Sequence, residues 1–92
     1  MITTIVLVRA EPKQIPQCAR HLAGIDGVTD VYSVSGDWDL VVILKVAEYE
    51  DIARIVTEKF PGVPGLVRTT TLTAFREYSK ADLEQAWDIG TG

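Results

Sequence analysis

The sequence predicts an α+β domain with the element order βαββαβ, a four-stranded antiparallel sheet with two helices on one face, as in ferredoxin-like folds. Three observations predict it: strand-like and helix-like stretches alternate in this order, a short motif recurs, and a hairpin signal lies between its two copies. Gly24-Ile-Asp-Gly27-Val28 matches Gly62-Val-Pro-Gly65-Leu66 at an offset of 38 residues, from Gly24 to Gly62. Two βαβ halves of this kind interleave into one sheet.

The first half of the chain predicts a strand, a helix and a second strand. Aliphatic and β-branched residues over Ile2–Val8 predict the first strand. Apolar residues then recur at i, i+3, i+4 and i+7, the spacing of one helical face, and they are Ile15, Cys18, Ala19 and Leu22. Gly24 and Gly27 end this helix, and Val28–Ser35 predicts the next strand.

The second half repeats this order, beginning with a strand over Leu40–Val46. A second helical stripe follows, formed by Tyr49, Ile52, Ala53, Val56 and Phe60. Pro61-Gly62 ends this helix, and a last long strand runs from about Leu66 to Tyr78. We therefore expect a domain over residues 1–78 and a tail over residues 79–92.

The tail has a helical signal of its own. Ser79-Lys-Ala-Asp82 has nearly the spacing of a capping box, and a short apolar stripe of Leu83, Ala86 and Trp87 follows. The pattern predicts a short C-terminal helix. This helix either packs on its own domain or anchors on a neighbouring subunit through Trp87, because aromatic residues are enriched at interfaces.

Composition limits the function. The net charge is −4, and the nine Lys and Arg residues are scattered with no two adjacent, which argues against direct binding to nucleic acid. A single cysteine excludes an intrachain disulfide. No stretch has the pattern of a signal peptide or the roughly 20 apolar residues of a membrane span, so we expect a cytoplasmic protein. No metal-ligand cluster, phosphate-binding glycine loop or nucleophile motif predicts a cofactor, a metal or a catalytic residue.

The two central strands carry apolar residues on both faces. Neither Ile5–Val8 nor Leu40–Leu44 alternates apolar with polar residues, as a strand with one wet face does. Two helices cover only one face of the sheet. The simplest cover for the other face is the same face of another copy, so the sequence predicts a homodimer formed by packing of sheet on sheet.

The junction between the halves is the sequence Gly36-Asp37-Trp38-Asp39. A glycine followed by an aspartate between two strand-like runs is a hairpin signal. Turn geometry favours small and polar residues, and it does not require a tryptophan. Trp38 at this tip therefore indicates that a ligand or another subunit covers the turn.

These residues resemble the ligand-binding domain of the Lrp/AsnC transcription regulators, also called the RAM domain. The resemblance rests on Val31-Tyr-x-Val-x-Gly36-x-Trp-Asp39 and on Pro64-Gly-Leu-Val-Arg-Thr-Thr-Thr71, and it extends from about Ile2 to Tyr78. It implies a dimeric α/β barrel that assembles further into octamers or similar rings. It also implies amino-acid effectors bound near the hairpin, between dimers.

The usual regulators of this family also carry a helix-turn-helix domain before the ligand-binding domain. Here the first strand begins at Ile2, so we expect a stand-alone form that does not read DNA itself. In that case the family implies a further partner, a full-length regulator joined through mixed oligomers.

An amino-acid ligand needs an acceptor for its ammonium, donors for its carboxylate and a pocket for its side chain. Asp37 or Asp39 supplies the acceptor, and Gly36 permits a close approach to the backbone. Trp38 forms one wall of the pocket. The hydroxyls of Thr69 and Thr71, which share one face of the last strand, complete this candidate ligand-binding set.

Each of these residues also has a purely structural interpretation. Gly36 and Asp37 suit a tight hairpin, Asp39 can bind backbone N–H groups near the turn, and threonine is a good strand residue. We interpret His21 as a surface residue and Cys18 as a core residue. Two rival functions remain open: a small dimeric-barrel enzyme related to monooxygenases, which would depend on His21, and a purely structural assembly module.

Overall fold

The computed structural model describes residues 1–81, which form one sheet, two helical segments and the first part of the tail. The elements are β1 (Ile2–Ala10), a 3-10 turn η1 (Pro12–Gln14), α1 (Ile15–Ala23), β2 (Val28–Ser33), β3 (Leu40–Val46), α2 (Tyr49–Arg54), a π-helical turn η2 (Ile55–Lys59), a 3-10 turn η3 (Phe60–Gly62) and β4 (Leu66–Thr73).

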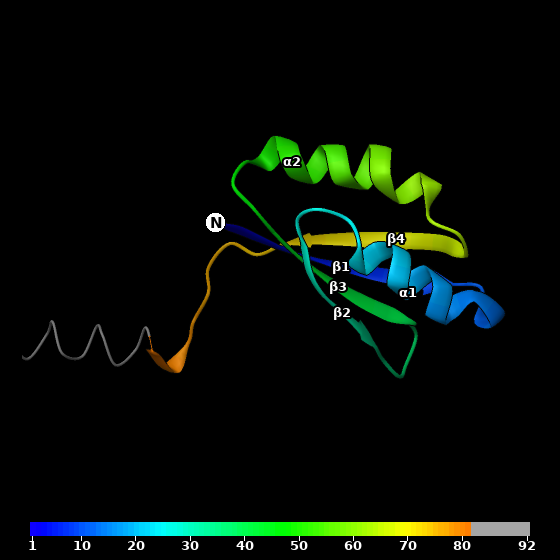
Figure 1. Cartoon of the computed structure of the whole chain (residues 1–92). Helices are drawn as coiled ribbons and strands as arrows, with labels where there is room; N and C mark the ends of the chain where they lie inside the picture. The colour runs from blue at the N-terminus through cyan, green and yellow to red at the C-terminus, as the bar shows by residue number, and fades with distance from the viewer. Residues whose placement is uncertain (82–92) are drawn as a thin grey trace, which may run out of the picture.

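The four strands pair antiparallel in the order β2-β3-β1-β4, so that β1 and β3 lie in the centre. Both helices cover the same face of this sheet, and α2 lies above β4 (Figure 1). The predicted α+β, ferredoxin-like fold with the order βαββαβ is therefore confirmed.

The core lies between the helices and the central strands. Side chains alternate along a strand, and the helix-facing set is buried on both central strands. The core set comprises Thr4, Val6, Val8 and Ala10 of β1, Leu40, Val42, Leu44 and Val46 of β3, Cys18 and Leu22 of α1, and Ile52, Ile55, Phe60 and Val63 of the second helical segment and the loop after it. The predicted core positions Cys18 and Leu22 are confirmed, and both are fully buried.

The internal repeat is a repeat of conformation. One glycine in each half has a positive φ, Gly27 at 100° and Gly65 at 82°. One backbone hydrogen bond recurs in the turn of each half, from the Val28 N–H to the Ile25 carbonyl at 3.0 Å and from the Leu66 N–H to the Val63 carbonyl at 3.4 Å. The motif that recurs in the sequence therefore corresponds to two helix-to-strand turns with the same backbone conformation.

The predicted ends of three strands are wrong. β1 ends at Ala10 rather than Val8. β4 ends at Thr73 rather than Tyr78, because its partner β1 begins at Ile2 and the last cross-strand bond joins the Ala74 N–H to the Thr3 carbonyl at 3.0 Å. β2 ends at Ser33 rather than Ser35. Its successor, Val34, donates its N–H to the Asp39 carbonyl at 3.0 Å and so closes the hairpin loop.

The predicted stripe of the second helix is wrong at two positions. Tyr49 is 66% exposed and Ala53 is exposed, whereas Ile55, outside the stripe, is buried. The buried positions are Ile52, Ile55 and Phe60, and the π-helical turn over Ile55–Lys59 widens the last of these spacings to five residues. The Thr57 hydroxyl donates to the Ala53 carbonyl at 2.6 Å within this turn.

The face of the sheet opposite the helices is apolar at its centre. Cross-strand pairing places Ile5 and Leu7 of β1 beside Ile43 and Val41 of β3 on this face. Tyr32 and Leu72 extend the patch onto the edge strands, with 53% and 47% of their surface exposed. The prediction that both faces of the central strands are apolar is therefore confirmed.

The predicted C-terminal helix lies outside the described residues, apart from Ser79, Lys80 and Ala81. The same holds for Trp87, so its two proposed packing partners stay predictions. No helix within residues 1–81 is long and apolar enough to cross a membrane.

Candidate functional site

The hairpin loop joining β2 to β3 spans residues 34–39. Gly36 turns the chain with φ 103°, a conformation that suits glycine, and open space surrounds the position of a Cβ atom there. The Asp39 N–H donates to the Val8 carbonyl at 2.9 Å, which attaches the base of the loop to β1 just beyond the last pair of the ladder, Val8 and Leu40. The base of the loop is therefore part of the sheet, and its tip is exposed.

Asp39 ties the loop to β1 a second time. Its carboxylate oxygen Oδ2 accepts a hydrogen bond from the Ala10 N–H at 2.9 Å, in a partly buried position. The carboxylate thus replaces the backbone carbonyl that a longer β3 would supply. Asp39 thus binds a backbone N–H near the turn, as its structural interpretation from the sequence expects. This hydrogen bond uses one of the two carboxylate oxygens.

Two arginines reach the same loop from the sheet. Arg9 donates from Nε to the Asp37 carbonyl at 2.9 Å. The guanidinium carbon of Arg68 lies 5.7 Å from the centre of the Trp38 ring, within the range of a cation–π contact. Trp38 is half-buried as a result, and β4 as well as β1 contacts the loop.

A hollow of about 400 Å³ opens where the loop, the end of β1 and the start of β4 meet. Its lining is mixed in charge, and it comprises Arg9, Ala10, Glu11, Pro12, Gly36, Asp37, Asp39 and Val67. Ligand pockets for small molecules are typically about 300–1,000 Å³. Within residues 1–81, the Asp37 carboxylate makes no hydrogen bond or ion pair, so it is available to a cationic group.

A β-bulge shapes the floor of this hollow. Arg9 pairs with Arg68 but Ala10 pairs with Leu66, so Val67 is the extra residue of β4. Bulges redirect side chains and recur beside binding sites. Val67 is 57% exposed and lines the hollow, although no pattern in the sequence marks it as a site residue.

The structure brings together only part of the candidate ligand-binding set. Gly36, Asp37 and Asp39 line the hollow, while Trp38 faces Arg68. Thr69 and Thr71 pair with Val8 and Val6, which places both threonines on the helix-covered face of the sheet. They do not line this hollow.

Arg9, Glu11 and Arg68 are charged neighbours of the hairpin that no motif in the sequence marks as site residues. Arg9 and Arg68 could have been found from the register, because residues at the ends of β1 and β4 meet beside the hairpin of the predicted sheet. Glu11 follows β1 directly, and its N–H donates to the Gly65 carbonyl at 2.8 Å. The β1–α1 loop and the loop before β4 are thereby held together at the site.

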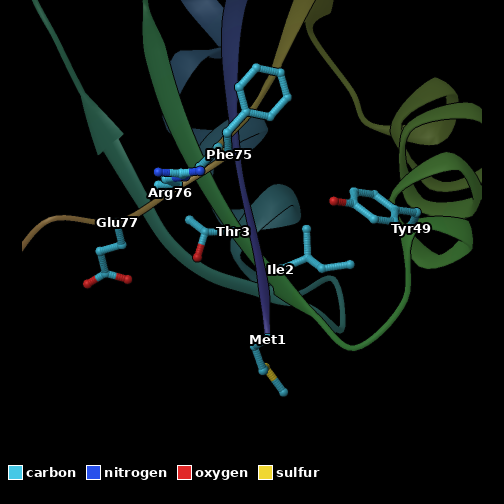
Figure 2. Close-up of a pocket in the computed structure, with 8 residues that line it drawn as sticks. Met1, Ile2, Thr3, Tyr49, Phe75, Arg76 and Glu77 are labelled. Carbon is cyan, nitrogen blue, oxygen red and sulfur yellow. The ribbon is translucent and has the colours of Figure 1, made fainter.

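A second hollow lies at the opposite end of β1 and holds about 160 Å³, less than a typical ligand pocket. Figure 2 shows Tyr49 on the α2 side of this hollow, and Arg76 and Glu77 on the chain that leaves β4. A third hollow of about 350 Å³ lies between α2 and β4, and Thr71 lines it together with Tyr49, Ile52, Ala53, Val56, Thr57 and Thr73. Neither hollow contains a residue of the hairpin.

The two residues considered for other chemistry lie away from the hairpin. Cys18 is buried in α1, and this burial raises the pKa of its thiol, which keeps it protonated and unreactive. His21 is exposed on α1 and lines a shallow hollow with Arg20, Gly24 and Ile25. Within residues 1–81, no group of three or more His, Cys, Asp or Glu side chains could hold a metal ion.

The chain belongs to the family of the Lrp/AsnC ligand binding domain, whose sequence model matches residues 3–83. A related HTH-type transcriptional regulator of Pyrococcus furiosus is 33% identical over 76 residues, covering 79% of this chain and 51% of the regulator. The chain thus spans about half the length of the curated relatives it matches. These relatives are named as HTH-type transcriptional regulators.

Solved structures agree with the fold. TTHA0845 of Thermus thermophilus superposes with a TM-score of 0.81 and 35% identity, covering 87% of this chain and all of that one. A feast or famine regulatory protein of Mycobacterium tuberculosis, solved in complex with L-methionine, superposes with a TM-score of 0.71 and 21% identity, covering 87% of this chain and 54% of that one. At this identity the second likeness concerns the fold alone.

Proposed function

We propose that residues 1–78 form an amino-acid effector-binding module of Lrp/AsnC-type transcription regulation. The proposal is based on the hollow beside the hairpin. Within residues 1–81 the Asp37 carboxylate makes no hydrogen bond, and the Arg9 guanidinium lines the same hollow. A free amino acid carries one ammonium and one carboxylate, which these two groups complement. The methionine bound by the M. tuberculosis regulator supports an amino acid as the ligand class.

Within the hollow, each residue has a distinct role in the proposal. Asp37 accepts hydrogen bonds from the ligand's ammonium, and Gly36 leaves the backbone open to close approach. Asp39 acts mainly as a positioning residue, because one of its oxygens holds the Ala10 N–H. Trp38 stacks with Arg68 beside the hollow and does not line it, so Val67 and Pro12 supply its apolar wall. Thr69 and Thr71 act only if a neighbouring subunit extends the site over the helix-covered face.

The module works as a homodimer in this proposal. The apolar face formed by Ile5, Leu7, Val41 and Ile43 has no cover among residues 1–81, and large exposed apolar patches commonly mark interfaces. The same face of a second copy is self-complementary under two-fold symmetry. Dimers of this kind would associate further into a ring of the octamer type, in which the effector favours one assembly state over another.

The direct test is a thermal-shift screen against the twenty amino acids. A ligand at 100 times its dissociation constant adds about 2.7 kcal/mol of stability, which raises the melting temperature by several degrees. We expect one selective shift that Asp37→Ala abolishes. Asp26→Ala, which removes an exposed aspartate of the α1–β2 loop, serves as the matched control and should keep the response.

A chain that responds to no amino acid would count against the proposal and favour the assembly-module alternative. In the enzyme alternative, the pocket lies between the helices and the sheet. The hollow there is lined by aliphatic, threonine and tyrosine side chains, with no histidine or carboxylate among its lining residues. Co-purification with a full-length regulator of the family tests the proposed partner, and recovery of this chain alone would argue against it.

A further inference from the structure

The groove between α2 and β4 is an apolar surface without a cover among residues 1–81. Ile52, Ala53 and Val56 form its helical wall, and Thr71 and Thr73 form its floor. It holds about 350 Å³, and its apolar residues lie side by side at helical spacing. At one end it reaches Tyr49, which also lines the smaller hollow in Figure 2.

The helical layer is incomplete above β4. On the central strands, the helix-facing side chains Val6 and Val42 are fully buried. On β4, Thr71 and Thr73 occupy equivalent positions on the same face and are exposed. Figure 1 shows only α2 above β4, so one further helix laid along the groove would cover these positions.

Within the described residues, the segment that follows β4 does not enter the groove of its own domain. Residues 74–81 pass the hollow that residues 74–77 share with Tyr49 and then lead away from the end of the sheet (Figure 1). Phe75 is 95% exposed and Tyr78 is 78% exposed, so this segment carries aromatic side chains that its own domain leaves uncovered. Phe75 and Tyr78 are therefore available for contact with a second molecule.

The sequence beyond this segment has the pattern that the groove requires. Leu83, Ala86 and Trp87 are apolar at i, i+3 and i+4, which is how an amphipathic helix presents anchors to an apolar groove. The family model ends at residue 83, so most of this pattern is an addition to the shared domain. We propose that residues 82–92 of a second copy of the chain dock in the groove between α2 and β4, with Trp87 as the anchor.

The distance between the copies can be bridged. The six residues from 74 to 79 belong to no helix or strand and span up to about 20 Å when extended, at roughly 3.3 Å per residue. Stacked sheets lie about 10 Å apart, so this length exceeds the spacing between the two sheets of the proposed dimer. Because the occupant comes from a second copy, the inference rests on the proposed homodimer, and the reciprocal exchange of two tails would lock that dimer.

Engineered cysteines test the docking in the full-length chain. One copy carries Ala53→Cys in the groove and the co-expressed copy carries Ala86→Cys in the tail. Native Cys18 is fully buried and does not interfere. After mild oxidation we expect a disulfide between the copies, seen as a dimer on a non-reducing gel and as a linked peptide by mass spectrometry. Glu58→Cys, an exposed position in η2 outside the groove, replaces Ala53→Cys in the control and should not crosslink.

A double variant carries both cysteines in one chain. If it forms only an intrachain disulfide, the tail occupies its own groove and the inference is overturned. Light scattering gives the mass of the same samples and separates the two proposals. A dimeric protein without any crosslink overturns the docking and leaves the homodimer standing, whereas a monomeric protein overturns both.

Discussion

Arg9 and Arg68 are directly opposite each other on β1 and β4, and each side chain contacts the hairpin loop. Like charges opposite each other in a sheet repel, so a separate partner for each arginine stabilises the pair. The Asp37 carbonyl accepts a hydrogen bond from Arg9, and the Trp38 ring makes a cation–π contact with Arg68. The loop joining the two halves is thereby attached to the first and the last strand of the sheet.

Asp39→Ala is expected to destabilise the domain by about 1–2 kcal/mol, because it leaves the partly buried Ala10 N–H without an acceptor. Asp39→Asn keeps an acceptor oxygen and should cost less. Urea denaturation of both variants measures the difference. Equal losses would show that the charge, rather than the hydrogen bond, stabilises the loop.

Gly27→Ala should destabilise the domain more than Gly36→Ala. Both glycines have φ near 100°, which costs an alanine about 1–3 kcal/mol. At Gly27 the added Cβ would also lie 2.9 Å from the Ile55 side chain, whereas at Gly36 it meets nothing. Free energies of unfolding compare the two, and Gly62→Ala, with an open environment and no positive φ, is the control.

Arg68→Ala should change the fluorescence of Trp38 with little effect on stability. A cation–π contact at an exposed site contributes about 0.5–1 kcal/mol. A Trp87→Phe background leaves Trp38 as the single tryptophan. We expect a shifted emission maximum in Arg68→Ala and a smaller shift in Arg68→Lys, which retains a cation. Unchanged emission in both would mean that Arg68 does not contact the ring in solution.

Stability should fall in alkaline solution through Cys18. Burial raises the pKa of this thiol in the folded state above its unfolded value of about 8.5. In this pH range the unfolded chain releases the thiol proton more easily than the folded chain does. The contribution of Cys18 to the free energy of unfolding is therefore fully present below pH about 8.5 and is lost as the pH rises through the folded pKa. Denaturation of the native chain and Cys18→Ala from pH 7 to 10 checks this, since the variant lacks this part of the decline.

Much of the fold follows from periodicity. The apolar run Leu40–Val46 has the bounds of β3, and the spacing of Cys18 and Leu22 gives the buried face of α1. The π-helical turn over Ile55–Lys59 could not be predicted, because no local pattern in the sequence distinguishes it from an α-helix. The end of β4 could not be predicted from its own sequence either, because it is set by where its partner β1 begins.

The site was predicted less completely than the fold. Gly36 and Asp37 were selected because the turn chemistry of a hairpin is local and visible in sequence. Val67 depends on a bulge, which is a one-residue shift between distant strands. The placement of Thr69 on the helix side follows from its pairing with Val8, so it required the register of β4 on β1.

The strand order β2-β3-β1-β4 has a consequence for how the chain folds. β1 is made first, yet both of its neighbours, β3 and β4, begin only at Leu40 and Leu66. The central strand β1 therefore stays unpaired until β3 has been synthesised, and its second edge stays open until β4 follows. Closing these two ladders requires loops of high sequence separation. Contacts of this kind slow folding relative to helical bundles of the same size. An apolar, unpaired β1 is consequently the segment of the nascent chain most exposed to aggregation.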